Sequence, residues 1–305
     1  MRRRHLVINA KARGHQTRTR WVSRMQRLAR GQLTVHVTES LDDLERVSDL
    51  IAESDPELVA ISGGDGSLMA GVTALHRRLE HLPVIAPLRA GTAGTVARNW
   101  GASPSPLKSL ERLLARRAEI TLRASLRVTT PEAPPRLGFI FGTGLVARFF
   151  RIYDARGAPG NRGAARIVAR ILAESFYGGP MAEEVLTPLP CRLTIDGQPC
   201  GPDAWSLVAC ATVKNLGLHM LVTHRAEEDP SRPHLVASCL PPASLGPRIG
   251  RVLLGQHIGG QDHVDRLVSR FAIAFDTCGP WVLDGELFAS PQVEVAAGPE
   301  LRVAT

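Results

Sequence analysis

The first 117 residues alternate short apolar runs with amphipathic segments, and this alternation is the strongest constraint on the fold. The apolar runs predict strands at residues 6–9, 33–38, 57–62 and 82–88. The amphipathic segments predict helices at residues 40–53, 67–79 and 105–117. Strands that alternate with helices form βαβ units, and these build a parallel sheet. The first part of the chain is therefore expected to be an α/β domain.

Glycine-rich loops follow two of these strands. Gly63-Gly64-Asp65-Gly66 comes directly after the third strand, and Gly91-Thr92 comes after the fourth. Glycine lets a ligand approach the backbone closely, and the N–H groups that open the next helix attract anions. An aspartate beside a phosphate group needs a metal ion or a hydroxyl proton between the two. The first loop therefore indicates phosphoryl transfer rather than simple anion binding.

Polar residues also end the first two strands. Asn9 ends the first strand and begins a basic loop that reaches Gly14, and Thr38 ends the second strand. Ligands of parallel sheets bind at the carboxyl ends of the strands, so one nucleotide could touch these residues and both glycine loops. Ordinary turn chemistry is the competing interpretation for each position taken alone.

The pattern changes near residue 119. Short strands with alternating polarity and turn signals begin at residues 120–128, and DGQP at 196–199 predicts a hairpin turn. One clear amphipathic helix interrupts them, at residues 161–176. This half predicts a mostly antiparallel β-sandwich domain. The expected division is a nucleotide-binding domain at 1–118, a β domain at 119–290, and a last strand within 291–305 that could return to the first domain.

Composition narrows the class of partner. The net charge of +8, carried mainly by arginine, favours nucleotides or an anionic lipid surface. Only 5% of the residues are aromatic, which argues against stacking on single-stranded nucleic acid, and no nucleic-acid partner is expected. No apolar run approaches the roughly 18 residues of a membrane span. The N-terminus lacks the apolar segment of a signal peptide, so we expect a cytoplasmic protein.

Cysteine and histidine show no familiar metal-binding spacing. The five cysteines include no CxxC pair, and the ten histidines include no HExxH motif. The sequence therefore predicts buried free thiols rather than a zinc site or a disulfide framework. His219 is expected to be a core or turn residue.

Five features together resemble the diacylglycerol kinase catalytic-domain family. They are GGDGS at 63–67, GTAGTVAR at 91–98, the Asn9 loop, Thr38 and WVLDGE at 281–286. That family includes bacterial lipid kinases and sphingosine and ceramide kinases, and it is remotely similar to NAD kinases and phosphofructokinases. The resemblance implies an α/β domain with an NAD kinase/phosphofructokinase-like parallel sheet that binds ATP, followed by an antiparallel β-sandwich domain that receives the lipid.

The resemblance also implies roles for particular residues. The implied ATP contacts are Asn9, Thr38, Gly63, Gly64, Asp65, Gly66, Ser67 and Thr92. Glu286 would be the general base, with Asp284 beside it, and Asp65 would act at the phosphates through Mg²⁺. A lipid hydroxyl has a pKa far above 7, so a carboxylate must accept its proton as the new bond forms. The charge of the γ-phosphate requires Mg²⁺ and backbone N–H groups to offset it.

The sequence departs from the family pattern at several positions. Gly94 stands where the family has asparagine, Ala10 replaces a proline, and Ser67 replaces a threonine. The segment KNLGLHM at 214–220 lacks the aspartate that holds a structural Mg²⁺ in some members. Two alternatives therefore stay open beside the lipid kinase. One is a small-molecule kinase related to NAD kinase or phosphofructokinase, and the other is a catalytically weak nucleotide- or lipid-binding protein.

The acceptor side carries a basic helix. Arg162, Arg166 and Arg170 are spaced four residues apart, with apolar residues on the opposite face. A basic amphipathic helix can bind an anionic membrane, so the expected partner is a lipid at the inner membrane surface. A solvated helix packed on the β domain is the competing interpretation. The oligomeric state, including a homodimer, stays open.

Overall fold

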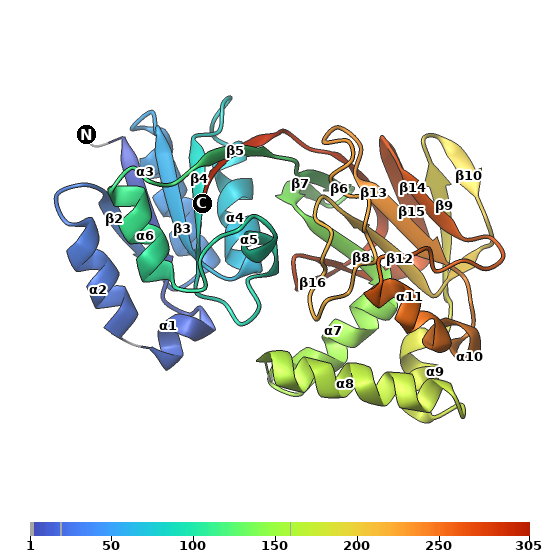
Figure 1. Cartoon of the computed structure of the whole chain (residues 1–305). Coiled ribbons are helices and arrows are strands. Elements are labelled where there is room, and N and C mark those ends of the chain that lie inside the picture. Colours follow the sequence, from blue (N-terminus) through green and yellow to red (C-terminus); the bar gives the residue numbers. More distant parts are fainter. Residues whose placement is uncertain (1–2, 19, 159) are drawn as a thin grey trace. The chain divides into compact units, whose positions relative to one another are not determined.

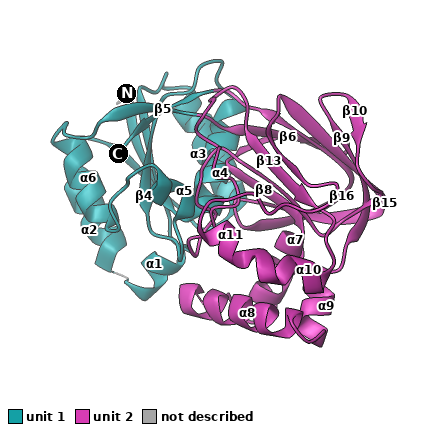
Figure 2. Ribbon diagram, turned by 45° about the vertical axis from the view of Figure 1, so that its right-hand side comes forward, with its two compact units in different colours: residues 1–123, 300–305 teal, residues 124–299 magenta. Residues whose placement is uncertain are grey.

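The structure is a computed structural model that describes residues 3–18, 20–158 and 160–305 (Figure 1). The chain forms two compact units (Figure 2). One unit contains the residues up to Arg123 together with Glu300–Thr305, and the other contains Ala124–Pro299. Within the described part of the chain, no helix is long and apolar enough to cross a membrane.

The first unit is built on one sheet. Its strands are β1 (Arg4–Asn9), β2 (Thr34–Thr38), β3 (Leu58–Gly63), β4 (Val84–Arg89), β5 (Ile120–Arg123) and β17 (Leu301–Ala304). Among the described residues the sheet has six strands in the order β2–β1–β3–β4–β17–β5. All neighbours pair in parallel except β17 and β5, which are antiparallel. The predicted α/β domain with a mainly parallel sheet is confirmed.

Helices cover both faces of this sheet. They are α1 (Arg13–Thr17), α2 (Arg20–Ala29), α3 (Leu41–Ala52), α4 (Asp65–His76), α5 (Thr95–Asn99) and α6 (Pro106–Leu114). Met25 of α2 and Leu110 of α6 pack with Leu6 and Ile8 of β1 in one buried cluster. Helix α4 lies on the opposite face, where Gly71 approaches Ile61 so closely that an added Cβ would lie 2.9 Å from its Cδ1.

The predicted start of the amphipathic helix at 40–53 is confirmed in detail. Ser40 precedes α3, and its hydroxyl accepts a hydrogen bond from the backbone N–H of Asp43. The Asp43 carboxylate in turn accepts from the backbone N–H of Ser40. Each side chain thus satisfies one of the N–H groups that the first helical turn leaves without a partner.

The last strand belongs to the first sheet. β17 lies between β4 and β5, with Val303 opposite Ile85 and Thr121. The alternating segment at 120–128 is divided, because β5 belongs to the first unit whereas β6 belongs to the second. The units therefore meet in sequence at 123/124 and 299/300, not at the expected positions near 118 and 290.

The second unit contains an antiparallel sheet. Its strands are β6 (Leu126–Thr130), β7 (Ala133–Gly138), β8 (Ile140–Gly144), β9 (Leu189–Ile195), β10 (Gln198–Cys200), β11 (Ala204–Trp205), β12 (Leu207–Ala211), β13 (His234–Ser238), β14 (Val264–Leu267), β15 (Arg270–Leu283) and β16 (Glu286–Ala297). The main order is β14–β13–β12–β8–β15–β16–β6–β7, and β9 also pairs with β15. The predicted antiparallel second domain is confirmed. The DGQP turn joins β9 to β10, with Asp196 and Gly197 both at positive φ.

More helices occur in this unit than the one that the sequence predicts. They are α7 (Leu145–Ala155), α8 (Gly160–Ser175), α9 (Pro180–Leu186), α10 (Pro242–Leu245) and α11 (Ile249–Leu253), with a 3₁₀ turn η1 (Gly246–Arg248). Their apolar residues pack on Leu207, Ala209 and Val236 of the sheet. Aromatic residues in α7 lower its helix propensity, and this packing outweighs that preference.

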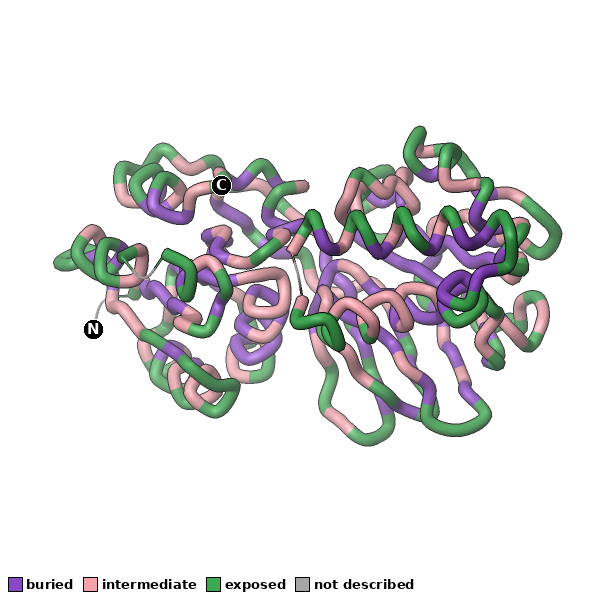
Figure 3. Tube along the Cα trace, turned by 90° about the horizontal axis from the view of Figure 1, so that it is seen from below, coloured by how far each residue is buried: buried purple, intermediate pink, exposed green. Residues whose placement is uncertain are grey.

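Burial follows the repeat of two residues in strands and of about 3.6 residues in helices. In Figure 3 the strands carry most of the buried residues, whereas the turns that connect them are exposed. Helix α8 buries Ile167 and Ile171 and exposes its arginines, so it presents one face to the protein and one to solvent.

Candidate active site

The predicted nucleotide contacts of the first unit come together at one edge of its sheet. Asn9, Thr38 and Gly63 are the last residues of β1, β2 and β3, and Asn9 lies opposite Thr38. The side-chain amide of Asn9 donates a hydrogen bond of 2.8 Å to the hydroxyl of Ser67, in the first turn of α4. Thr38 is buried, and its hydroxyl donates to the carbonyl of Ile8. Asn9 and Ser67 are thus paired side chains, whereas Thr38 supports the β1–β2 edge.

Close backbone contacts explain why glycines occur at this edge. An added Cβ on Gly63 would lie 2.4 Å from the Ser67 side chain, and one on Gly91 would lie 2.3 Å from the Cα of Gly64. The carbonyl of Gly63 accepts hydrogen bonds from the N–H groups of Ala90 and Gly91. A side chain at these glycines would separate the two loops, so their residue type is fixed by backbone packing.

The GGDG loop opens a helix. Gly64 is the N-cap of α4, and Asp65, Gly66 and Ser67 form its first turn. The first N–H groups of any α-helix lack partners inside the helix and carry a partial positive charge. The loop therefore provides the backbone geometry that binds a phosphate group.

Asp65 points toward the second glycine loop. One carboxylate oxygen accepts a hydrogen bond of 2.7 Å from the N–H of Thr95, and the other accepts one of 3.0 Å from the N–H of Val96. These residues form the first turn of α5, so Asp65 caps that helix. Burial raises the pKa of the Asp65 carboxyl, while the two N–H bonds and then Arg89 act in the opposite direction. Asp65 could coordinate a Mg²⁺ ion only through the carboxylate lone pairs that do not accept these two hydrogen bonds.

The second loop has a left-handed residue at its end. Gly94, the N-cap of α5, has φ +53° and ψ 47°. An added Cβ there would lie 2.9 Å from Nε of Arg89. Glycine and asparagine are the residues that adopt this conformation most readily. The left-handed backbone therefore suits glycine at this position and would also suit the asparagine that the resemblance implies. Thr92, the predicted nucleotide contact of this loop, is exposed.

Asp284 lies in the hairpin turn between β15 and β16, within the second unit. Its φ is +50° and that of Gly285 is +90°, as a two-residue hairpin loop requires. The side chain is buried, and it accepts hydrogen bonds from the backbone N–H groups of Phe139 and Ile140. Asp284 thus holds the turn against the start of β8.

Glu286 follows this turn as the first residue of β16, and it is exposed. Desolvation, and after it the negative charge of Asp154 on α7, raise the pKa of the Glu286 carboxyl above its usual value. A carboxylate with a raised pKa accepts a proton more readily, which suits a general base. Within this unit, Glu286 is exposed to solvent whereas Asp284 is bound to backbone.

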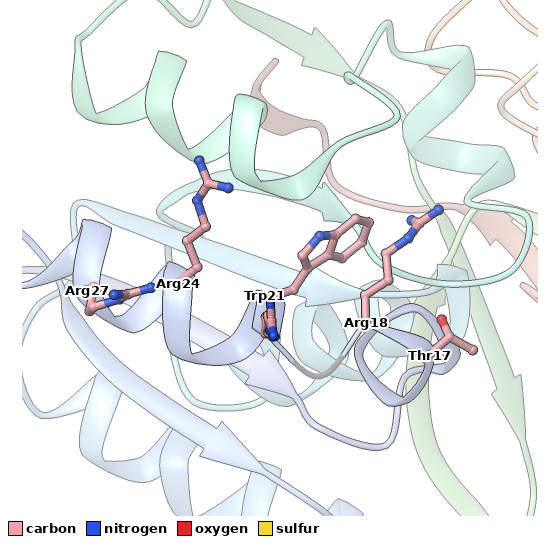
Figure 4. A pocket seen from close by; sticks show the side chains of 6 residues that line it. Thr17, Arg18, Trp21, Arg24 and Arg27 are labelled. Atoms are coloured by element: carbon pink, nitrogen blue, oxygen red, sulfur yellow. The ribbon is translucent and has the colours of Figure 1, made fainter.

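A basic pocket of about 560 Å³ lies on α1 and α2 (Figure 4). It is lined by Thr17, Arg18, Arg20, Trp21, Arg24 and Arg27. The Arg18 guanidinium lies 4.4 Å from the centre of the Trp21 ring, a cation–π distance. None of the predicted nucleotide contacts lines this pocket.

Three residues of the site region were not predicted. Arg89 approaches the Gly94 loop, Asp154 faces Glu286, and His15 is buried with Nε2 at 2.9 Å from the Ser62 hydroxyl. Only His15 had a signal in the sequence, because it follows Gly14 in the basic loop after the first predicted strand. No motif marks Arg89, although it lies only five positions before Gly94, and the approach of Asp154 to Glu286 joins segments 132 positions apart.

Comparison with known proteins agrees with this geometry. Residues 3–122 match the model of the diacylglycerol kinase catalytic domain. The sequence matches no curated protein. A solved structure assigned as a diacylglycerol kinase of Bacillus anthracis str. Sterne is 18% identical, with a TM-score of 0.69 over 97% of this chain and 95% of that one. Another from the same organism is 14% identical, with a TM-score of 0.60 over 95% and 92%. These structures establish the fold.

Proposed function

We propose that this chain, whose residues 3–122 match the model of the diacylglycerol kinase catalytic domain, transfers the γ-phosphoryl group of ATP to a hydroxyl group of a lipid. Such a domain implies a phosphotransferase. The observation that carries the proposal is the edge where Asn9 pairs with Ser67 and where Gly64 contacts Gly91 beside the start of α4. At that edge the backbone offers N–H groups and lets phosphate groups approach closely, as binding of a nucleoside triphosphate requires.

The three predicted acids have different roles in the proposed reaction. Glu286 accepts the proton of the lipid hydroxyl. At the same time the hydroxyl oxygen forms a bond to the γ-phosphorus, and the bond from that phosphorus to ADP breaks. Mg²⁺, held with the phosphates at Asp65, would offset their charge. Asp65 and Asp284 act mainly by position, because each uses its carboxylate on backbone N–H groups. The raised pKa of Glu286 supports its assignment as the base.

The test is transfer of labelled phosphate from Mg-ATP to acceptors in mixed micelles. The panel contains diacylglycerol, monoacylglycerol, ceramide, sphingosine and undecaprenol, with NAD and fructose 6-phosphate in parallel. We expect a labelled lipid with wild type and a loss of at least about a hundredfold in kcat with Glu286→Gln, the lower end of the range for a general base. Glu294→Gln, an exposed acid on the same strand, is the matched control.

Each other outcome has a definite meaning. Label on NAD or the sugar would replace the lipid with a small-molecule acceptor. ATP binding by calorimetry without any labelled product would favour the nucleotide- or lipid-binding protein. Equal activity of the Glu286→Gln and Glu294→Gln proteins would remove Glu286 as the base.

We also propose that α8 brings the protein to an anionic membrane. Arg162 and Arg166 are exposed, and Phe176 and Tyr177 at the end of the helix are 69% and 72% exposed. Arginines attract anionic headgroups, and aromatic residues favour the membrane interface. Arg170 has a different role, because its Nε lies 2.6 Å from Glu174, whose other oxygen accepts from the N–H of Met181 in α9.

Co-sedimentation with anionic vesicles tests this surface. The double variant Arg162→Glu/Arg166→Glu, which leaves the Arg170–Glu174 pair intact, should lose most of the binding. Arg192→Glu reverses one charge of the same kind at an exposed position on β9 and should bind as wild type does. Undiminished binding of the double variant would remove the proposal.

A further inference from the structure

A cluster of histidines surrounds one aspartate at the edge of the antiparallel sheet. Asp265 lies on β14, and its side chain is only 4% exposed. Four imidazoles converge on this region: His224, His234, His257 and His263. His234 begins the neighbouring strand β13, whereas the others come from the segments before and after that strand. The cluster is separate from every residue of the proposed kinase site.

Asp265 is held by two of these histidines. Its Oδ1 lies 2.8 Å from His234 Nε2, and its Oδ2 lies 2.8 Å from His257 Nδ1. The other nitrogen of His234, Nδ1, accepts a hydrogen bond from the N–H of Arg225, so its hydrogen must be on Nε2. His234 therefore donates to Oδ1 and fixes the orientation of the carboxylate. A buried partner of this kind is typical around metal-binding carboxylates.

Two ring nitrogens of the cluster are buried without a partner among the described residues. They are Nδ1 of His224 and Nε2 of His263. Nδ1 of His263 lies 3.0 Å from the carbonyl oxygen of Ala237, to which it must donate. In that tautomer Nε2 carries a lone pair that faces Oδ2 of Asp265 at 3.6 Å. A lone pair opposite a carboxylate is unfavourable unless a cation lies near both.

We propose that His224, His257 and Asp265 bind a divalent transition-metal ion of the Zn²⁺ type. One ligand atom from each of the three lies within 4.8 Å of the other two. Tetrahedral Zn²⁺ with bonds of about 2.0–2.1 Å needs its ligands roughly 3.3 Å apart, which small side-chain rotations provide. Imidazole with one carboxylate is a donor set that favours Zn²⁺ over Mg²⁺. Nε2 of His263 lies 3.6 Å from Oδ2 of Asp265, and the ion accounts for its unpartnered lone pair.

The site would join three segments that are distant in sequence. His224 belongs to the connection between β12 and β13, His257 to the connection after α11, and Asp265 to an edge strand. The metal would therefore stabilise long connections at the edge of the sheet. The sequence predicts no zinc site here, because the spacing of these ligands, 33 and then 8 positions, matches no short motif.

Metal binding to the full chain, prepared without a histidine tag, tests the proposal. We expect about one equivalent of Zn²⁺ after dialysis, and with Co²⁺ the visible absorption of a four-coordinate site. His257→Ala should weaken Zn²⁺ affinity at least tenfold. His257 is 61% exposed, so this variant should keep its fold, which circular dichroism would check. His81→Ala removes an exposed histidine outside the cluster and should bind as wild type does.

Three results would overturn the site. One is no stoichiometric Zn²⁺ or Co²⁺ binding by wild type, which would leave a hydrogen-bonded Asp265 network with a protonated His263. Another is equal affinity of wild type and His257→Ala, and the third is displacement of Zn²⁺ by millimolar Mg²⁺. None of these measurements uses ATP or a lipid, so they are independent of the proposed kinase activity.

Discussion

At the scale of single residues, two predicted catalytic acids prove to be bound to the backbone. Asp65 accepts from Thr95 and Val96, and Asp284 accepts from Phe139 and Ile140. An aspartate next to glycine in a turn is well suited to such bonds, because its short side chain reaches N–H groups that loops leave unpaired. Glu286, one methylene longer and exposed, is left for the acceptor.

Asp154→Asn should shift the pH dependence of the reaction. Glu286 works as a base only when it is deprotonated, so kcat/KM falls as pH drops below its pKa. The charge of Asp154 helps to raise that pKa, and its removal should lower it. We expect the acid limb of the kcat/KM profile to move to lower pH by roughly 0.2–0.7 units, the scale of interactions between exposed charges.

The matched control is Glu132→Gln, which removes one negative charge from an exposed turn of the same unit. Its acid limb should coincide with that of wild type. A profile for Asp154→Asn that is unmoved, or moved to higher pH, would contradict the assignment of Glu286 as the titrating base.

Gly94 allows the departure from the family pattern to be measured. Gly94→Ala must take φ +53° with a Cβ close to Arg89, which should cost about 1–2 kcal/mol of unfolding free energy. Gly94→Asn should cost less, because asparagine tolerates the left-handed region. Urea denaturation gives both values, and calorimetry with Mg-ATP shows whether the asparagine amide improves binding. Equal losses for the two variants would indicate that contact with Arg89, rather than φ, decides the cost.

At the scale of elements, the neighbouring strands β1 and β2 carry a histidine pair. His5 Nδ1 lies 3.2 Å from His36 Nε2, and the side chain of His5 is 2% exposed. Burial, and then the nearby His36, lower the pKa of His5 to about 4. The unfolded chain would bind a proton near pH 6.5, so stability is complete above that pH and declines as pH falls toward 4.

This pair predicts acid sensitivity of the first unit. Between pH 7 and pH 5, His5 alone should remove about 2 kcal/mol of stability. Hydrogen exchange at the β1 and β2 amides measures this locally. In His5→Gln, protection should fall less over the same interval, whereas His81→Gln, which changes an exposed histidine, should follow wild type. Parallel pH curves for His5→Gln and wild type would contradict the prediction.

Local signals predicted most elements of the first unit, and distant pairing explains the errors. The α3 capping box and the glycine loops are formed by residues close together in the sequence, so the sequence predicts both. β5 was assigned to the wrong domain because its partner β17 lies about 180 residues later. β15 contains three exposed residues, Asp276–Cys278, in its middle. A register shift between Ala274 and Gly279 lets one strand continue through them.

The site was predictable to the same extent. The strand ends in the sequence pattern predict that Asn9 and Gly63 lie at one sheet edge, whereas the roles of Ser67 and Glu286 are predictions from the family resemblance. The histidine–aspartate cluster was missed because its members gather only when β13 and β14 pair. The spacing of these residues in the sequence does not predict that they lie close together.

At the scale of the whole molecule, β17 makes the first unit depend on the end of the chain. Leu301, Val303 and Ala304 are buried between β4 and β5. A chain ending at Pro299 should leave β5 without its strand partner, open one edge of β4 and expose this apolar surface. Hydrogen exchange should show lost protection in β4 and β5, with protection retained in the sheet of the second unit. Arg302→Ala, an exposed change in the full chain, should exchange as wild type does.

The position of β17 also has a consequence for biosynthesis. A ribosome releases residues in order, so a nascent chain contains β4 and β5 long before it contains β17. During that interval the second unit, residues 124–299, can complete its own strand pairing, whereas the sheet of the first unit remains open. Domains usually finish folding in the order of their synthesis. Here the unit that is translated first is completed last, and its unpaired strands need protection from other nascent chains until translation ends.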